Sequence, residues 1–448
     1  MSDSRSILPG EIWYQILLCA IDAPWVLDTT VPAEGCFWHQ QDKYHNEATY
    51  NLAEIYRRNI RLVCRAWRDF ADEHRFRWIT WDPKPIEDTS RRTRDAEEAL
   101  GVHAPPCLSP GGWAVAASRS MRRTAARPLR ILISVKNNRD LGILRDAVYF
   151  SFGKLTTLFI NCRANYGTPI FDLLIQNSPL LPCVRCLMLK HLDFTGTPLA
   201  YISTAFPKLT GMTLEGGTFP HNPEDYLILP QAESLYFDFE TMDGMTCSNW
   251  RVPSLLRLSV PILWNDNGQE DAEVFTCLRL HGSNLRFLHV NYAENVKLPA
   301  SIWKWCPKVT EIVTSFSVVS LPPIPSDHPV QYFVHIINHD APSHELMASG
   351  WTSHKEAPKL LGNVERMPKG ALLVVGVQTW GACWGGEMHL LRRATIQAFW
   401  SLINETCVTK DIRLENESKQ TYQEYLQEKT QNLNFSMGGL SLEARSSA

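Results

Sequence analysis

The 448-residue chain has no run of apolar residues long enough to cross a membrane. A spanning helix needs about 18 consecutive apolar residues, and the apolar stretch near the amino terminus, residues 12–21, is short and contains Tyr14 and Gln15. That stretch also makes a poor secretory signal, because it lacks a small-residue cleavage site. The sequence therefore predicts a protein of the cytoplasm or the nucleus, with no membrane partner.

A dense cysteine framework is missing as well. Twelve cysteines are scattered over the chain, which is typical of reduced thiols in an intracellular protein of this length. Cys183 and Cys186 form a CxxC pair near His191, but a structural zinc site needs four ligands and no second pair stands at a useful distance. Because the pair overlaps an apolar repeat, we expect core packing and no metal site.

The chain also lacks the signatures of common catalytic sites. His335 and His339 are four residues apart but have no glutamate between them, unlike the zinc motif HExxH. The glycine-rich segment 381–387 matches neither phosphate-binding loop pattern, and GxSxG is absent. We therefore expect no enzymatic activity and no cofactor. An enzyme with an unrecognised site remains the alternative, and it would need a deep pocket of convergent polar groups.

A strongly basic balance is missing too. The chain has 44 Lys and Arg against 47 Asp and Glu, a formal net charge of −3. One arginine run spans residues 57–77, but Glu54, Asp69, Asp72 and Glu73 interleave with it. Such mixed runs are typical of a solvated helix face, so no nucleic-acid partner is predicted.

An apolar–x–x–apolar–x–apolar pattern recurs after residue 128. Six clear copies begin 23 to 30 residues apart, within or close to the period of leucine-rich repeats. A proline often stands one or two residues before the pattern, which suits the beginning of a strand better than its middle. The copies are Leu155/Leu158/Ile160, Val184/Leu187/Leu189, Leu209/Met212/Leu214, Ala232/Leu235/Phe237, Leu255/Leu258/Val260 and Leu285/Leu288/Val290.

Helical patterns fill the segments between these copies, for example Leu141/Leu144/Val148. One strand plus one helix per repeat predicts an α/β fold: a curved, leucine-rich-repeat-like solenoid with a parallel sheet. The alternative is a doubly wound α/β sheet. The predicted domains are a helical module at 1–82, a linker at 83–127, the repeat domain at 128–408 and a polar tail at 409–448. A helix at about 389–406 is expected to cap the array.

Two helical patterns lie in the amino-terminal module. In the first, Leu8 and Pro9 precede Glu11, and Ile12, Ile16 and Leu17 follow on an apolar stripe. The second pattern runs from about residue 52 to 70 and contains the block Leu62-Val63-Cys64-Arg65-Ala66-Trp67-Arg68. From pattern alone, the two helices are more simply an amphipathic pair that packs on the repeats.

Together the two motifs resemble the F-box family, and an F-box followed by irregular repeats is similar to many fungal members. The resemblance covers about residues 7–72, with residues 22–51 as a loop insertion that is longer than usual. It implies docking on a Skp-type adaptor, and through it on cullin and RING subunits, in an SCF ubiquitin ligase. The repeat domain would then bind a target protein. The residues that match the adaptor-facing or core positions are Leu8, Pro9, Ile12, Ile16, Leu17, Leu62, Val63, Cys64 and Trp67.

Alternation along the predicted strands places every second side chain on the concave face of the sheet. These side chains could contact the target, or they could simply pack on one another across strands. A repeat scaffold that binds a partner without coupling to ubiquitination is the alternative function. The predicted contact residues are Phe159, Asn161, Met188, Lys190, Glu215, Tyr236, Asp238, Arg257, His289 and Asn291.

Overall fold

The computed structural model divides into two compact units, Met1–Leu255 and Leu256–Ala448, which we describe separately. Within the parts it describes, no helix is both long and apolar enough to span a bilayer. The structure describes residues 10–21, 52–53, 55–73, 78–81, 130–151, 153–162, 166–190, 199–216, 226–237, 247–262, 272–293, 297–315, 319–336, 356–375, 390–416 and 419–428.

The first unit begins with a small helical module. It contains α1 (Gly10–Ala20), a helical segment at 55–60 and α4 (Arg65–Glu73). The prediction of one helix over 52–70 is wrong, because the helix ends in a turn at 61–63. There the amides of Leu62 and Val63 donate to the carbonyls of Asn59 and Ile60 at 3.0 and 3.1 Å.

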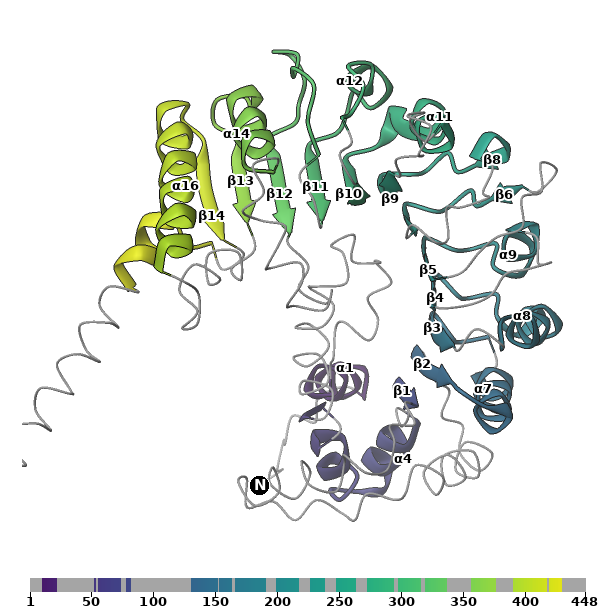
Figure 1. Ribbon diagram of the computed structural model, residues 1–448. Coiled ribbons are helices and arrows are strands. Elements are labelled where there is room, and N and C mark those ends of the chain that lie inside the picture. Colours follow the sequence, from purple (N-terminus) through teal and green to yellow (C-terminus); the bar gives the residue numbers. More distant parts are fainter. Residues whose placement is uncertain are drawn as a thin grey trace, which may run out of the picture. The chain divides into compact units, whose positions relative to one another are not determined.

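Strands of the first unit form a parallel sheet whose order follows the chain. Helices α7 (Asn138–Ser151), α8 (Gly167–Gln176) and α9 (Leu199–Ala205) lie in a row beside it (Figure 1). Two short strands outside this sheet, β6 (Leu227–Ile228) and β8 (Trp250–Arg251), pair with each other. The strands of the sheet are β1 (Trp78–Trp81), β2 (Arg130–Val135), β3 (Thr157–Cys162), β4 (Cys186–Lys190), β5 (Gly211–Glu215) and β7 (Ser234–Phe237).

The second unit repeats this plan. Its helices are α11 (Ala272–His281), α12 (Ile302–Trp305), α14 (Glu356–Arg366) and α16 (Leu390–Thr409). Its parallel strands again follow chain order: β9 (Arg257–Ile262), β10 (Phe287–Ala293), β11 (Glu311–Ser315), β12 (Tyr332–Ile336), β13 (Leu372–Val375) and β14 (Arg413–Asn416).

Strand order within each unit decides between the two predicted α/β architectures. A doubly wound sheet reverses its strand order at a switch point, whereas the described strands of each unit follow chain order without a reversal. Each strand pairs with the strand of the next repeat, as stacked repeats require. The prediction of an α/β repeat fold with a parallel sheet is therefore confirmed.

Apolar positions of the repeat form continuous ladders across the strands. Leu158 lies in register with Leu187, and Leu187 lies in register with Met212. All three side chains are completely buried. In the second unit, Leu258 pairs with Leu288 in the same way. The alternating pattern therefore predicted the buried side of the strands correctly.

The prolines before the strands occupy a recurring turn. In Phe206-Pro207-Lys208-Leu209, the amide of Leu209 donates to the carbonyl of Phe206 at 3.2 Å, so Pro207 takes the second position of a β-turn, where its fixed φ is favourable. The same bond joins residues 181 and 184, 229 and 232, 252 and 255, and 306 and 309. The proline thus precedes the strand, as predicted, but its role is to form this turn.

Both predicted boundaries of the repeat domain need correction. β1 was assigned to the helical module, yet it pairs in parallel with β2 and belongs to the repeat sheet. β14 was assigned to the polar tail, yet it pairs with β13. Beyond β14, the amide of Asn416 donates to the carbonyl of Gln420 at 2.9 Å, and Tyr422 and Tyr425 are buried. The repeat sheet therefore begins at residue 78 in the first unit, and in the second unit the described structure continues past β14 to residue 428. The predicted linker lies outside the described residues.

One asparagine fixes the segment before β12. The buried amide group of Asn363, on α14, donates to the carbonyl of Val319 at 2.7 Å. Its side-chain oxygen accepts from the amide of Leu321 at 2.8 Å. Ser320 forms a single bridge with Lys297, and Asn363 pairs the backbone groups of Val319 and Leu321 on either side of it, which otherwise would be buried and unpaired.

We expect Asn363→Asp to lower the free energy of unfolding by about 1–3 kcal/mol, because a carboxylate cannot donate to Val319 and the carbonyl would be left buried and unpaired. Urea-induced unfolding followed by tryptophan fluorescence measures the change. Asn284→Asp is the matched control, since the exposed Asn284 only accepts a bond from Lys308. Equal effects of the two substitutions would contradict this role of Asn363.

Candidate functional site

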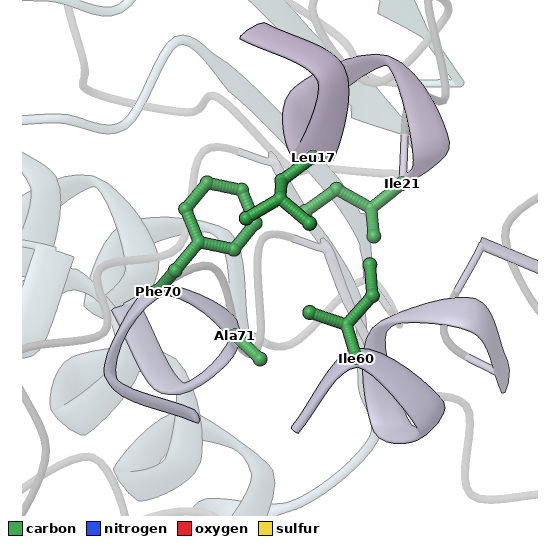
Figure 2. Packing of buried hydrophobic residues seen from close by; sticks show 5 residues of the cluster. All are labelled: Leu17, Ile21, Ile60, Phe70 and Ala71. Atoms are coloured by element: carbon green, nitrogen blue, oxygen red, sulfur yellow. The ribbon is translucent and has the colours of Figure 1, made fainter. Parts of the chain in front are cut away.

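The helical module closes a very small core. It contains the buried side chains Leu17, Ile21, Ile60, Phe70 and Ala71, which converge from α1, the helical segment 55–60 and α4 (Figure 2). Leu17 is only 6% exposed. Of the two predicted roles, adaptor-facing or core, Leu17 therefore has the core role and holds the module together.

Several other residues of the predicted motif remain in solvent. Ile12 and Ile16 are 45% and 43% exposed, and Leu62 and Val63 are 80% and 60% exposed. Cys64 is exposed beside them in the sequence. We refer to Ile12, Ile16, Leu62, Val63 and Cys64 as the docking surface. Leu8 and Pro9 lie outside the described residues.

Aromatic pairs connect α1 to α4. The rings of Trp13 and Trp67 have centroids 5.6 Å apart, and those of Tyr14 and Phe70 are 5.2 Å apart at a right angle. Edge-to-face and tilted contacts at such distances add to the burial of the rings. Trp67, predicted to be adaptor-facing or core, is thus half-buried against Trp13 and braces the two helices.

Arg57 was predicted to lie on a solvated helix face, and this is wrong. Its side chain is buried, and a guanidinium nitrogen donates to the carbonyl of Ala71 at 3.0 Å. Ala71 lies in the last turn of α4, where carbonyls lack helical partners and a cation is favourable. Arg57 therefore ties the helical segment 55–60 to α4 across the exposed turn. Its position three residues before Ile60 is the signal that could have indicated burial.

The face of the sheet that points away from the buried ladders was predicted to bind a target. We call it the helix-free face. In the first unit, Lys190 makes an ion pair of 2.5 Å with Glu215 and lies 5.9 Å from the ring of Phe159. Tyr236 and Asn161 are also partly exposed there. These five predicted residues are therefore presented on one face, across four neighbouring strands.

Met188 and His289 do not offer such a surface. Met188 is 6% exposed, between Phe159 and Thr213 of the neighbouring strands, and His289 is 1% exposed. Their prediction as contact residues is corrected accordingly. Arg257 is exposed at the start of β9. Asp238 and the side chain of Asn291 lie outside the described residues.

The sequence reading missed part of the helix-free face in the second unit. Tyr332 is 48% exposed, and its register partner Leu372 is half-buried. Val334 and Val374 form the next register pair and are also half-buried. These strands follow weaker copies of the repeat pattern, and the alternation rule applied to them would have found all four residues.

Hydroxyl and imidazole groups pair inside the second unit. Ser259 Oγ lies 2.9 Å from His289 Nδ1, and Thr314 Oγ1 lies 2.8 Å from His335 Nδ1. Each pair joins register partners on adjacent strands. Burial lowers the pKa of His289 to about 3, so the imidazole is neutral at physiological pH. Ser259 and His289 thus satisfy each other's polar groups in the interior.

Cysteines of the array are packed in the core. Burial raises the pKa of Cys162 to about 11 and that of Cys407 to about 12. Cys306 is raised to about 12 by burial and then by the neighbouring Cys277. These thiols stay protonated and are poor nucleophiles. In the described part of the chain, no three His, Cys, Asp or Glu side chains are grouped to hold a metal ion.

Comparisons with known proteins leave the family open. No family model matches the chain, and no curated protein matches it. Among solved structures, the chain is similar to a Bacteroides fragilis protein from a structural genomics programme, with 12% identity and a TM-score of 0.34. The match covers 65% of this chain and 76% of the other. A TM-score this low is no basis for comparing folds or functions.

The pKa of His289 predicts a dependence of stability on pH. In the unfolded chain its pKa is about 6.5, so the unfolded state binds more protons between pH 6.5 and 3. Its contribution to stability is therefore complete above pH 6.5 and falls as the pH decreases toward 3, by at most about 1.4 kcal/mol per pH unit.

We expect His289→Asn to reduce the slope of unfolding free energy against pH between pH 6 and pH 4. Asparagine keeps a polar group near Nδ1 but does not titrate. Urea unfolding at several pH values measures both slopes. Identical slopes in the two proteins would show that His289 does not titrate as its burial requires.

Proposed function

We propose that this chain is the target-binding subunit of an SCF-type ubiquitin ligase. In this proposal the docking surface binds a Skp-type adaptor, which links the chain to cullin and RING subunits. The helix-free face of the array binds a target protein. The chain supplies no catalytic group of its own and acts by proximity, since holding two reactants together replaces a bimolecular encounter.

The observation that carries the proposal is the exposure of apolar side chains on a module whose own core is already closed. Leu17, Ile21, Ile60 and Phe70 are inside, while Leu62 and Val63 remain 80% and 60% exposed. Contiguous exposed apolar residues on a soluble domain mark interaction sites. The same residues carry the resemblance to the F-box motif, which supports an adaptor as their partner.

The partly exposed side chains on the helix-free face support the proposed binding of a target protein. Phe159, Tyr236 and Tyr332 present aromatic rings there, and Lys190 and Glu215 present a charged pair. Aromatic side chains are enriched among the residues that dominate binding energy. Parallel strands in register also hold such side chains at fixed spacing, which suits recognition of one folded partner.

Ile12→Asp tests the docking surface. We expect it to weaken adaptor binding by about 100-fold, because a charge would replace an anchor in a desolvated contact. The fold should be retained, since Ile12 lies in the first turn of α1, where a carboxylate is favourable. Binding of purified adaptor, measured by calorimetry, gives the result.

Leu402→Asp is the matched control for Ile12→Asp. Leu402 lies on α16 and is 46% exposed, against 45% for Ile12, so it receives the same change at equal exposure. It should bind the adaptor like the wild type. The ligase proposal fails if the wild type does not bind the adaptor, or if the Ile12→Asp variant binds it as tightly as the wild type. The alternative would then be a repeat scaffold that is not coupled to a ligase.

Cys64 gives a second, independent readout. It is exposed next to Leu62 and Val63, whereas Cys277 and Cys306 are buried. We expect saturating adaptor to slow alkylation of Cys64 at least about tenfold, because interface cores exclude water. Mass spectrometry of alkylated peptides measures the rate. An unchanged rate at Cys64 in a complex that demonstrably forms would place the adaptor elsewhere on the chain.

A further inference from the structure

The exposed turn of the module is flanked by arginines, in a stretch that Glu54 and Asp69 bound on either side. Residues 55–68 contain five arginines and no aspartate or glutamate, a local charge of +5 in a chain whose net charge is −3. Arg57 is buried and bonded to Ala71. The other four, Arg58, Arg61, Arg65 and Arg68, are exposed. The charge is thus displayed around the turn that carries Leu62 and Val63.

Helix stability does not explain the charge at the beginning of α4. Positive charge is unfavourable near the amino end of a helix and favourable near its carboxyl end. Arg65 is the first residue of α4 and Arg68 follows one turn later, while α4 has no acidic residue in its first turn and no basic residue in its last. The carboxyl end instead receives a cation from outside, Arg57. Arg65 therefore works against its own helix, which points to a role in binding, whereas Arg58 and Arg61 lie at the carboxyl end of the helical segment 55–60.

We propose that Arg58, Arg61, Arg65 and Arg68 form a basic collar around the docking surface, and that its partner is a protein surface with an apolar hollow rimmed by carboxylates. The proposal rests on the function proposed above and adds the chemistry of the adaptor's matching surface. The apolar turn inserts into the hollow, and the collar meets the rim. Opposite charges at an interface rim mainly accelerate association and align the partners.

A nucleic acid fits this surface less well than a protein does. Nucleic-acid binding depends on contacts between cations and phosphates, and it has no use for two aliphatic side chains at the centre of the patch. Leu62 and Val63 are 80% and 60% exposed between the arginines. An apolar patch with a polar rim is instead typical of a protein-interaction site.

The test measures association of the full chain with purified Skp-type adaptor by stopped-flow fluorescence. We expect the association rate to fall about tenfold between 50 and 500 mM NaCl, because salt screens charges beyond a few ångströms. Arg61→Gln combined with Arg65→Gln should lower the low-salt rate about three- to tenfold and leave the dissociation rate within about twofold.

Arg145→Gln combined with Arg279→Gln is the control, since both arginines are exposed on helices of the array. It should associate like the wild type. The Arg61/Arg65 variant should unfold at the same or a higher urea concentration, because it removes a cation from the first turn of α4. Should that variant unfold, Arg58→Gln combined with Arg68→Gln provides the same test.

Failures of the two proposals are distinguishable. A wild type that does not bind the adaptor at any salt concentration overturns the proposed function. Adaptor binding whose rate is independent of salt and of the collar substitutions overturns the collar and leaves the function standing. A duplex oligonucleotide that binds through Arg61 and Arg65 and displaces the adaptor would also overturn the collar as a protein-binding device.

Discussion

No single repeat of this chain can bury its own apolar side chains, and each depends on the next for its core and for its hydrogen bonds. The carbonyl of Thr156 accepts the amides of Arg185 and Cys186, at 2.8 and 3.0 Å, from the following repeat. Arg185 and Thr210 in turn serve the repeats after them. Because one carbonyl just before such a strand accepts two amides of its neighbour, these bonds and the apolar ladders together fix the register of the strands. Stacking therefore makes the array cooperative between neighbours.

The amino-terminal module follows a different physical rule. In its described part, the module leaves several apolar side chains exposed beside a closed core. Its core accepts Leu17, Ile21, Ile60, Phe70 and Ala71, and the aliphatic residues of the turn stay outside. Where the array achieves burial by stacking repeats, the module leaves part of its apolar surface exposed, and the proposed function assigns that surface to an adaptor. The proposed function depends on this difference between the module and the array.

Sequence reasoning was strongest where side chains obey one period. Alternation located Leu158, Leu187 and Leu288 on the buried side without further information. It was weaker on the opposite face, because exposure there depends on the size of side chains on adjacent strands. Met188 and His289 alternate correctly yet are buried. The sequence pattern of one strand does not indicate which side chains lie beside it on the next strand.

Pairing between strands that are far apart in the sequence set the other limit on prediction. β1 pairs with β2 across 48 intervening residues, so nothing local could assign residues 78–81 to the repeat sheet. Helical periodicity likewise could not separate Leu17 from Ile16, since the two are adjacent on one apolar stripe and only the position of α4 decides which is covered. Ile16 is 43% exposed and Leu17 6%.

A charged side chain can indicate a function when its position in a helix destabilises that helix. Arg57 and Arg65 belong to one arginine run, and composition treats them alike. One is buried at the carboxyl end of α4, where a cation stabilises the helix; the other is exposed at the amino end, where a cation does not. A residue that stabilises its helix needs no further explanation. A residue that opposes its helix calls for an explanation outside helix stability, and at the docking surface we propose that the explanation is a partner.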